Sequence, residues 1–215
     1  YNPGLIVWME QPAAAVRQAW KVRRISDEVH GIHGLLCGDV DHDRRLDLLA
    51  TSAQPKPPYP ESLVWFPVPD DVHSTESWTT HVFAERDAPG LTHYLGLGDV
   101  NGDGRVDATT GAKGGPQDAS GKGEWFAWWE APQDPTRTWR KHLISDAQPG
   151  ATNIHPADVN GDGRMDFIAA RGHGRGVIWF ESPGWKEHPI NETIQEPHCL
   201  VVVDMDEDGD VDAAS

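Results

Sequence analysis

Residues 99–107 read DVNGDGRVD, and residues 158–166 read DVNGDGRMD. Two further stretches follow the same plan, DVDHDRRLD at 39–47 and DMDEDGDVD at 204–212. In all four, positions 1, 3, 5 and 9 are Asp or Asn, which supply the oxygen ligands that a hard cation such as calcium requires. The four acidic loops begin 60, 59 and 46 residues apart, so they also mark an internal repeat.

Short runs of alternating polar and apolar residues surround each acidic loop. Two of them flank each loop directly. Two more, each containing a tryptophan, follow the first three loops, and one further pair precedes the first loop. No 11-residue stretch has helical spacing. Four short strands per repeat with a recurring aromatic residue are typical of a β-propeller blade, so we expect an all-β protein built of four-stranded blades. In the first complete blade the expected strands A to D are 33–38, 46–51, 62–67 and 78–83.

An EF-hand is the competing interpretation of the acidic loops. It requires a carboxylate at loop position 12 and a helix on each side. Position 12 is Ala50, Thr110, Ala169 or Ser215 here, and both flanks have strand character. The sequence therefore excludes the EF-hand.

The loops and their flanking strands resemble the FG-GAP/VCBS repeat family of calcium-binding β-propellers over essentially the whole chain. This resemblance implies up to four structural calcium (Ca2+) sites, in which the seventh loop residue adds its backbone carbonyl oxygen. The implied ligands are Asp39, Asp41, Asp43, Arg45 and Asp47; Asp99, Asn101, Asp103, Arg105 and Asp107; Asp158, Asn160, Asp162, Arg164 and Asp166; and Asp204, Asp206, Asp208, Asp210 and Asp212.

The first loop departs from the pattern, because Arg44 replaces the glycine found at position 6 of the other three. That position favours a positive φ, where a residue with a side chain is less stable by about 1 kcal/mol. We therefore expect the first calcium site to be the weakest.

The repeat alignment predicts one β-propeller region over 1–215, in which both ends of the chain fall inside a blade. An incomplete set of blades from a larger propeller is favoured, with further blades or domains outside this chain. Alternatively, the two ends complete one blade and close a ring of four. The expected units are strands C and D of a partial blade at 1–30, blades at 31–90, 91–150 and 151–195, and strands A and B of a partial blade at 196–215.

The formal charge of −16 argues against a nucleic-acid partner, because phosphate recognition needs a basic surface. Four bound calcium ions would bring this charge to −8. No stretch approaches the roughly 20 apolar residues of a membrane span, and no signal peptide is present in the chain. A four-site calcium protein suits a secreted, periplasmic or cell-surface location. Cys37 and Cys199 lie in apolar runs and are expected to be buried free thiols.

Histidines gather on the face opposite the acidic loops. His33, His93 and His198 each stand six residues before the first loop aspartate, at the start of strand A, and His155 stands three before it. Strand A lines the channel of a propeller, so these imidazoles could converge and hold a transition metal or act as acid and base. The other interpretation is that each histidine only packs against a turn.

The B-to-C connections rise on the same face and differ most in length between repeats, as binding loops on a rigid scaffold do. We expect cationic residues there to meet a carboxylate or sugar hydroxyls, and aromatic residues to stack on a sugar ring. The alternative for each residue is that it is a solvated loop residue with no role in binding. The candidate ligand-binding residues are Tyr59, Trp125, Arg171, His173 and Arg175.

Two functions remain open, and the sequence does not decide whether the protein is an enzyme. The first is a calcium-stabilised binding or scaffold module for a carbohydrate or another protein. The second is a sugar lyase or dehydratase, suggested by a partial resemblance to the propeller of aldos-2-ulose dehydratase-like sugar enzymes.

His81, His142 and His188 on strand D are expected to be exposed rim residues.

Overall fold

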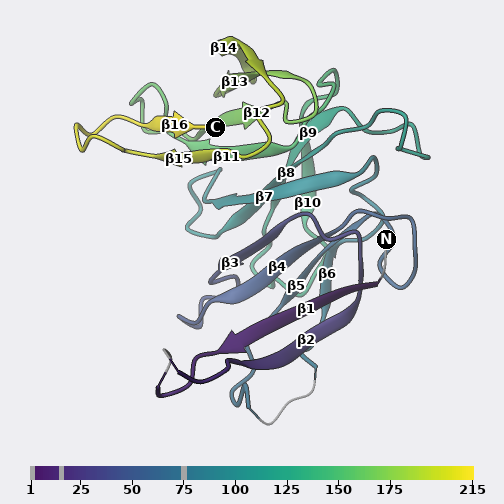
Figure 1. Cartoon of the computed structure of the whole chain (residues 1–215). Helices are drawn as coiled ribbons and strands as arrows, with labels where there is room; N and C mark the ends of the chain where they lie inside the picture. Colours follow the sequence, from purple (N-terminus) through teal and green to yellow (C-terminus); the bar gives the residue numbers. More distant parts are fainter. Residues whose placement is uncertain (1–2, 15–16, 74–76) are drawn as a thin grey trace.

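The computed structural model describes residues 3–14, 17–73 and 77–215 (Figure 1). These residues form sixteen β-strands and no helix, which confirms the predicted all-β class. No helix in the described part of the chain is long and apolar enough to cross a membrane.

The strands pair in chain order into three four-stranded antiparallel sheets with a two-stranded hairpin at each end. The first hairpin is β1 (Pro3–Glu10) and β2 (Lys21–His30), and the last is β15 (Val201–Val203) and β16 (Asp212–Ala214). The first sheet contains β3 (Leu35–Gly38), β4 (Asp47–Ser52), β5 (Ser62–Phe66) and β6 (His81–Ala84). The second contains β7 (Thr92–Gly98), β8 (Asp107–Ala112), β9 (Trp125–Glu130) and β10 (Arg140–Ser145). The third contains β11 (Asn153–Ala157), β12 (Asp166–Ala170), β13 (Arg175–Glu181) and β14 (Lys186–Gln195).

The five sheets follow one another as a fan, from the N-terminal hairpin to the C-terminal hairpin (Figure 1). The first strands of neighbouring sheets approach one another, since β7 contacts both β3 and β11. Every four-stranded sheet thus has its first strand innermost and its fourth strand outermost, which is the arrangement of β-propeller blades.

The second and third strands of each blade are largely buried on both faces, because a neighbouring blade or an end hairpin covers each side. All six residues of β4 and all five of β5 are buried. One core cluster joins Leu49, Leu63 and Trp65 of the first blade to Trp125 and Trp129 of the second. Each such side chain contributes roughly 1.5–3 kcal/mol through its burial, so apolar contact between blades is the main force that holds the fan together.

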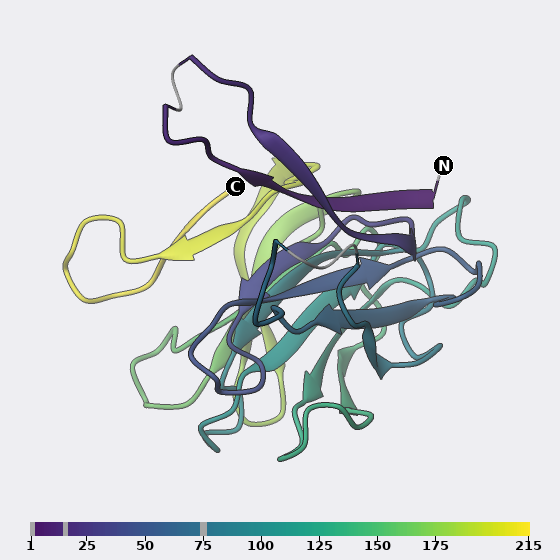
Figure 2. The same cartoon turned by 90° about the horizontal axis from the view of Figure 1, so that it is seen from below.

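The two end hairpins belong to separate sheets, so they do not pair into one blade in this structure. The N-terminal hairpin packs through Ile6, Ile25 and Val29 against the first blade. The C-terminal hairpin packs through Val202 and Val211 against the third. In Figure 2 both hairpins project from the body of the fan. Further blades outside this chain remain a prediction.

The expectation that strand-D histidines are freely exposed is wrong. His142 is half-buried, stacks on Trp128 with ring centroids 4.1 Å apart, and contacts Glu130 at 2.8 Å. The same stack recurs between His188 and Trp179 at 4.4 Å. A tryptophan on the third strand and its cross-strand histidine on the fourth therefore form a repeated structural contact at the outer edge.

The two cysteines are also not as predicted, since both side chains are exposed. Cys37 lies on β3, where exposed and half-buried side chains alternate. An innermost strand touches the next blade with only alternate side chains, so an apolar run there does not imply burial of every residue.

Candidate functional site

Each acidic loop joins the first strand of a sheet or hairpin to the second. In the loop at 99–107, the carboxylate of Asp99 accepts hydrogen bonds from the backbone N–H groups of Gly102, Asp103 and Gly104 at 2.8–3.0 Å. The loop at 158–166 has the same bonds from Asp162 and Gly163 to Asp158. The first aspartate therefore organises the turn around itself.

The carboxylates of the loops also approach one another. Oxygen atoms of Asp39, Asp41 and Asp43 all lie within 4.8 Å of one another, and the same holds for Asp204, Asp206 and Asp212. Oδ1 of Asp39 and Oδ1 of Asp204 are buried and have no hydrogen-bond partner within the described structure. Converging carboxylates with an unsatisfied buried oxygen are a donor set that fits a hard divalent cation.

The ninth residue of the loop has a second role that the sequence did not reveal. The buried carboxylate of Asp107 accepts one bond from the N–H of Val100 at 3.0 Å and another from Ala131 at 2.8 Å. It thereby ties the loop to the end of β9. Asp47 and Asp166 make equivalent pairs of bonds. Burial raises the pKa of all three carboxyls, that of Asp107 to about 6.

The seventh residue also uses its side chain. Arg45 forms an ion pair with Asp43 at 2.6 Å, and Arg164 forms one with Asp162 at 2.6 Å. Arg105 pairs with Asp103 in the same way. In the last loop the seventh residue is Asp210, so the guanidinium contact is confined to the first three loops.

Arg44 has the positive φ expected at this position, +70°. That the first calcium site is the weakest stays a prediction. The glycines at the same position, Gly104, Gly163 and Gly209, have φ of +85°, +82° and +96°. The first loop thus adopts the shared turn with a residue that is less suited to it.

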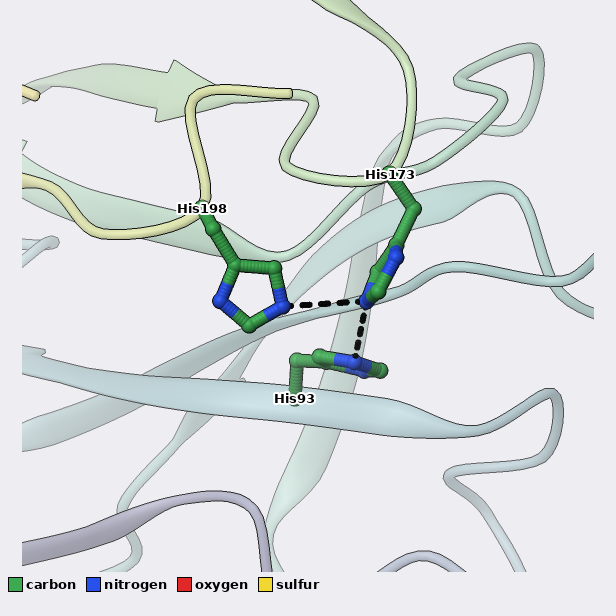
Figure 3. A group of neighbouring side chains, drawn as sticks. All are labelled: His93, His173 and His198. Carbon is green, nitrogen blue, oxygen red and sulfur yellow. Dashed lines mark hydrogen bonds between the residues drawn. The ribbon is translucent and has the colours of Figure 1, made fainter.

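Three histidines converge at the opposite end of the strands (Figure 3). His93 lies on β7, His173 lies in the connection between β12 and β13, and His198 lies just before β15. The Nε2 atom of His173 is 3.0 Å from Nε2 of His93 and 3.0 Å from Nε2 of His198. We call these three residues the histidine cluster.

Each outer member of the histidine cluster has a further polar contact. Nδ1 of His93 donates to the backbone carbonyl of Leu91 at 2.9 Å. Nδ1 of His198 lies 3.0 Å from the hydroxyl of Tyr94. Burial lowers the pKa of His93 to about 3, while partial burial and then the positive charge of Lys113 lower the pKa of His173. His93 is therefore neutral at physiological pH.

The expected ring of four histidines is only partly formed. His33 stacks on His93 with centroids 4.5 Å apart but is not among the three residues whose ligand atoms converge. His155 lies outside the group, and burial lowers its pKa. The prediction that His155 reaches the same site is wrong, because its ring lies against Gly96 on β7 of the neighbouring blade, where a Cβ atom would meet its Nδ1 at 3.2 Å.

His173 was predicted to be a ligand-binding residue of a B-to-C connection. Its position beside His93 and His198 was not predicted. Thr152 occupies the repeat position that holds His33, His93 and His198 elsewhere. Its hydroxyl accepts a bond from the N–H of Gly172 at 3.0 Å, which draws the β12–β13 connection over it. The signal in the sequence was a missing histidine at 152 and an additional one at 173.

The other candidate residues of the B-to-C connections differ in accessibility. Trp125 is buried in the core between two blades, so the prediction that it stacks on a sugar is wrong. Tyr59 is half-buried and its hydroxyl contacts Glu28 at 3.3 Å. Arg171 binds Gln148 and Glu187, whereas Arg175 is exposed.

Clefts lie along this face on either side of Lys113. A cleft of about 340 Å³ is lined by Gln54, His93, Lys113 and Gln117 among others, and a second of about 320 Å³ by Lys113 and His173. A shallower hollow of about 670 Å³ lies beyond His173, beside Arg175. Amide, cationic and imidazole groups therefore converge here.

Comparison with known proteins places part of the chain in one family. Residues 99–169 and 158–215 match a family model described as an FG-GAP-like repeat. Together the two matches cover 99–215, which is more than half of the 215 residues. A search of curated proteins finds no match.

Proposed function

Because the chain belongs to the FG-GAP-like repeat family, we propose that it is a calcium-stabilised β-propeller module that binds a carbohydrate or protein ligand on the face opposite its acidic loops. FG-GAP repeats are typical of extracellular or cell-surface proteins. We accordingly propose a secreted, periplasmic or cell-surface location, where calcium is abundant.

The converging carboxylates of the loops, at positions 1, 3 and 5 in the first loop and 1, 3 and 9 in the last, support the calcium part of this proposal. In the first loop Asp39, Asp41 and Asp43 would hold the ion, and Asp204, Asp206 and Asp212 would do so in the last. A bound cation would relieve the repulsion between these carboxylates and would satisfy the buried oxygens of Asp39 and Asp204. Its role would be to stiffen the turn between two strands of one blade.

The observation that carries the ligand-binding part is the row of clefts at the histidine end of the strands, where amide and cationic side chains stand among apolar ones. The two clefts beside Lys113, about 340 and 320 Å³, fall in the range of small-molecule sites. Gln54, Lys113 and Gln117 offer amide and ammonium groups, which hydrogen-bond to hydroxyl and carboxylate oxygens. This lining favours a saccharide unit over an apolar ligand.

The rigid blades below the clefts suit this role. The clefts are formed by connections of unequal length that are anchored on fully buried strands such as β4 and β8. A binding surface of variable loops on a fixed scaffold loses little conformational entropy when a ligand arrives. Lyase or dehydratase activity is not part of this proposal, because the family match names a repeat and no reaction.

A glycan array probed with the calcium-loaded protein tests the proposal. We expect binding to a subset of glycans that Lys113→Ala weakens about tenfold or more, since Lys113 lines both clefts. His188→Ala at the outer edge is the matched control and should bind normally. Binding that survives Lys113→Ala, or no binding to any glycan, would contradict a carbohydrate ligand in these clefts. The protein ligand would then be tested with the same pair of variants.

A further inference from the structure

We infer that His93, His173 and His198 form a binding site for a transition metal ion of the zinc class, separate from the acidic loops. This goes beyond the proposed function, which needs only calcium and the polar clefts. The three side chains come from a strand and two connections that are far apart in the sequence (Figure 3).

The spacing of the three Nε2 atoms suits a metal. Two of the separations are 3.0 Å, and all three ligand atoms lie within 4.8 Å of one another. Imidazole nitrogens bind zinc at about 2.0–2.1 Å, which places tetrahedral ligands about 3.3 Å apart. The two separations of 3.0 Å need to widen by a few tenths of an ångström to admit the ion, while the third pair, His93 and His198, lies within 4.8 Å.

Hydrogen bonding alone does not account for this arrangement. A ring nitrogen carries either one hydrogen or one lone pair, so Nε2 of His173 can make one good hydrogen bond but has two neighbours at 3.0 Å. Nδ1 of His93 carries the hydrogen that it donates to Leu91, so the Nε2 of neutral His93 is a lone pair that points at the cluster. A cation at the centre satisfies all three lone pairs together.

The surroundings hold the rings in ligand orientation. A histidine that binds a metal almost always has a hydrogen-bond partner on its other nitrogen. The carbonyl of Leu91 fulfils this role for His93, and the hydroxyl of Tyr94, which can accept from Nδ1, does so for His198. The tautomers that these contacts favour leave Nε2 free for a metal.

The backbone near His173 and His198 is fixed as well. Asn153 donates to the carbonyl of His198 at 2.7 Å, and the N–H of His173 donates to the carbonyl of Gly150 at 3.1 Å. A Cβ atom on Gly172 would lie 2.4 Å from Oγ1 of Thr152 and 2.9 Å from Cα of His198. Only glycine allows the β12–β13 connection to approach so closely, and this approach delivers His173 to the other two histidines.

The donor set selects the class of ion. Three neutral imidazoles suit zinc, cobalt, nickel or copper, whereas calcium requires oxygen ligands. Three protein ligands leave the fourth tetrahedral position open, and the exposure of His173 opens it to solvent. Lys113 lines the clefts on both sides, so water or an anionic oxygen ligand would occupy this position.

Titration of the protein with cobalt in excess calcium tests this inference. The protein is used without a polyhistidine tag, which would itself bind cobalt. The excess calcium is added to occupy the acidic loops. We expect one Co2+ per chain with the intense visible absorption of tetrahedral cobalt, which one equivalent of zinc abolishes. His173→Ala and His198→Ala, both outside the strands, should each weaken binding by at least about 100-fold, and Tyr94→Phe should weaken it about tenfold.

Two variants serve as controls for histidine and thiol ligands elsewhere. His142→Ala removes an edge histidine and Cys199→Ser removes the thiol beside His198, and both should bind cobalt as the wild type does. The inference is overturned by the absence of a stoichiometric tetrahedral cobalt spectrum, by binding that persists in both His173→Ala and His198→Ala, or by loss of binding in His142→Ala.

Discussion

The two ends of the blades are built on opposite plans. At one end the same acidic loop occurs four times, with the same positive φ at its sixth residue and, in the first three loops, the same buried aspartate bonds. At the other end the histidine cluster occurs once, from two residues at the same repeat position, His93 and His198, and a third, His173, from a connection. The repeated end ties the strands of each blade together, and the unrepeated end gives this chain a single site that its other blades do not share.

Thr152 illustrates this difference. A histidine at this position would have continued the repeat, but threonine allows Gly172 and His173 to enter from the neighbouring connection. A departure from the repeat therefore creates the cluster, whereas a departure in the acidic loops, Arg44, only makes one turn less favourable.

The largest effect is expected from calcium removal. An ion present at about 100 times its Kd stabilises the folded state by about 2.7 kcal/mol per site, and removing several such ions should lower the free energy of unfolding by several kcal/mol. Thermal unfolding with calcium and with EDTA measures this. An unchanged melting temperature would show that the acidic loops do not depend on calcium.

Loss of the buried aspartate bonds should have the next largest effect. Asp107→Ala leaves the N–H groups of Val100 and Ala131 without their acceptor, so we expect a loss of about 2–4 kcal/mol in urea unfolding. Asp107→Asn keeps one acceptor oxygen and should lose less. Lys113→Ala on the other face should change stability by less than about 0.5 kcal/mol. Equal losses at the two ends would refute the division between them.

A fall in pH should lower the free energy of unfolding mainly through the histidines. His93 has a pKa of about 3 in the folded chain and an ordinary value of 6.5, so its stabilising contribution is present above pH 6.5 and is lost as the pH falls. From pH 7 to 5 this loss amounts to about 2 kcal/mol in calcium without zinc. The raised pKa of Asp107 acts in the opposite direction, but the calcium ion proposed for this loop would keep that carboxylate charged. Urea unfolding of His93→Gln should show a flatter pH dependence, and an unchanged slope would contradict this assignment.

The smallest effect concerns the first acidic loop. Arg44→Gly should raise stability in calcium by about 1 kcal/mol, because glycine adopts the φ of +70° without steric conflict. Gly104→Arg is the reciprocal change and should lower stability by a similar amount, since nothing lies within 4 Å of a Cβ atom placed there. If neither change alters the stability, the residue at loop position 6 does not account for a difference between the loops.

Much of the blade could be predicted from the sequence, because polar and apolar residues alternate locally along each strand and the turn residues recur between strands. The segment 62–67 became β5, and the positive φ at Arg44 followed from the glycines at the matching positions. Trp125 was misjudged because β9 begins at that residue and not after it. His173 was not joined to His93 and His198, since the path of a connection over Thr152 depends on contacts between distant segments.

The most direct test of the account is a pair of variants, one from each end, measured for both metals and for melting temperature. Asp103→Ala should bind one calcium ion fewer than the wild type and melt at a lower temperature, but it should still bind one zinc ion per chain. His173→Ala should lose the zinc ion but keep its calcium, and in calcium without zinc its melting temperature should equal that of the wild type. A single variant that loses both metals, or a His173→Ala chain that keeps its zinc, would contradict the separation of a structural end from a functional end.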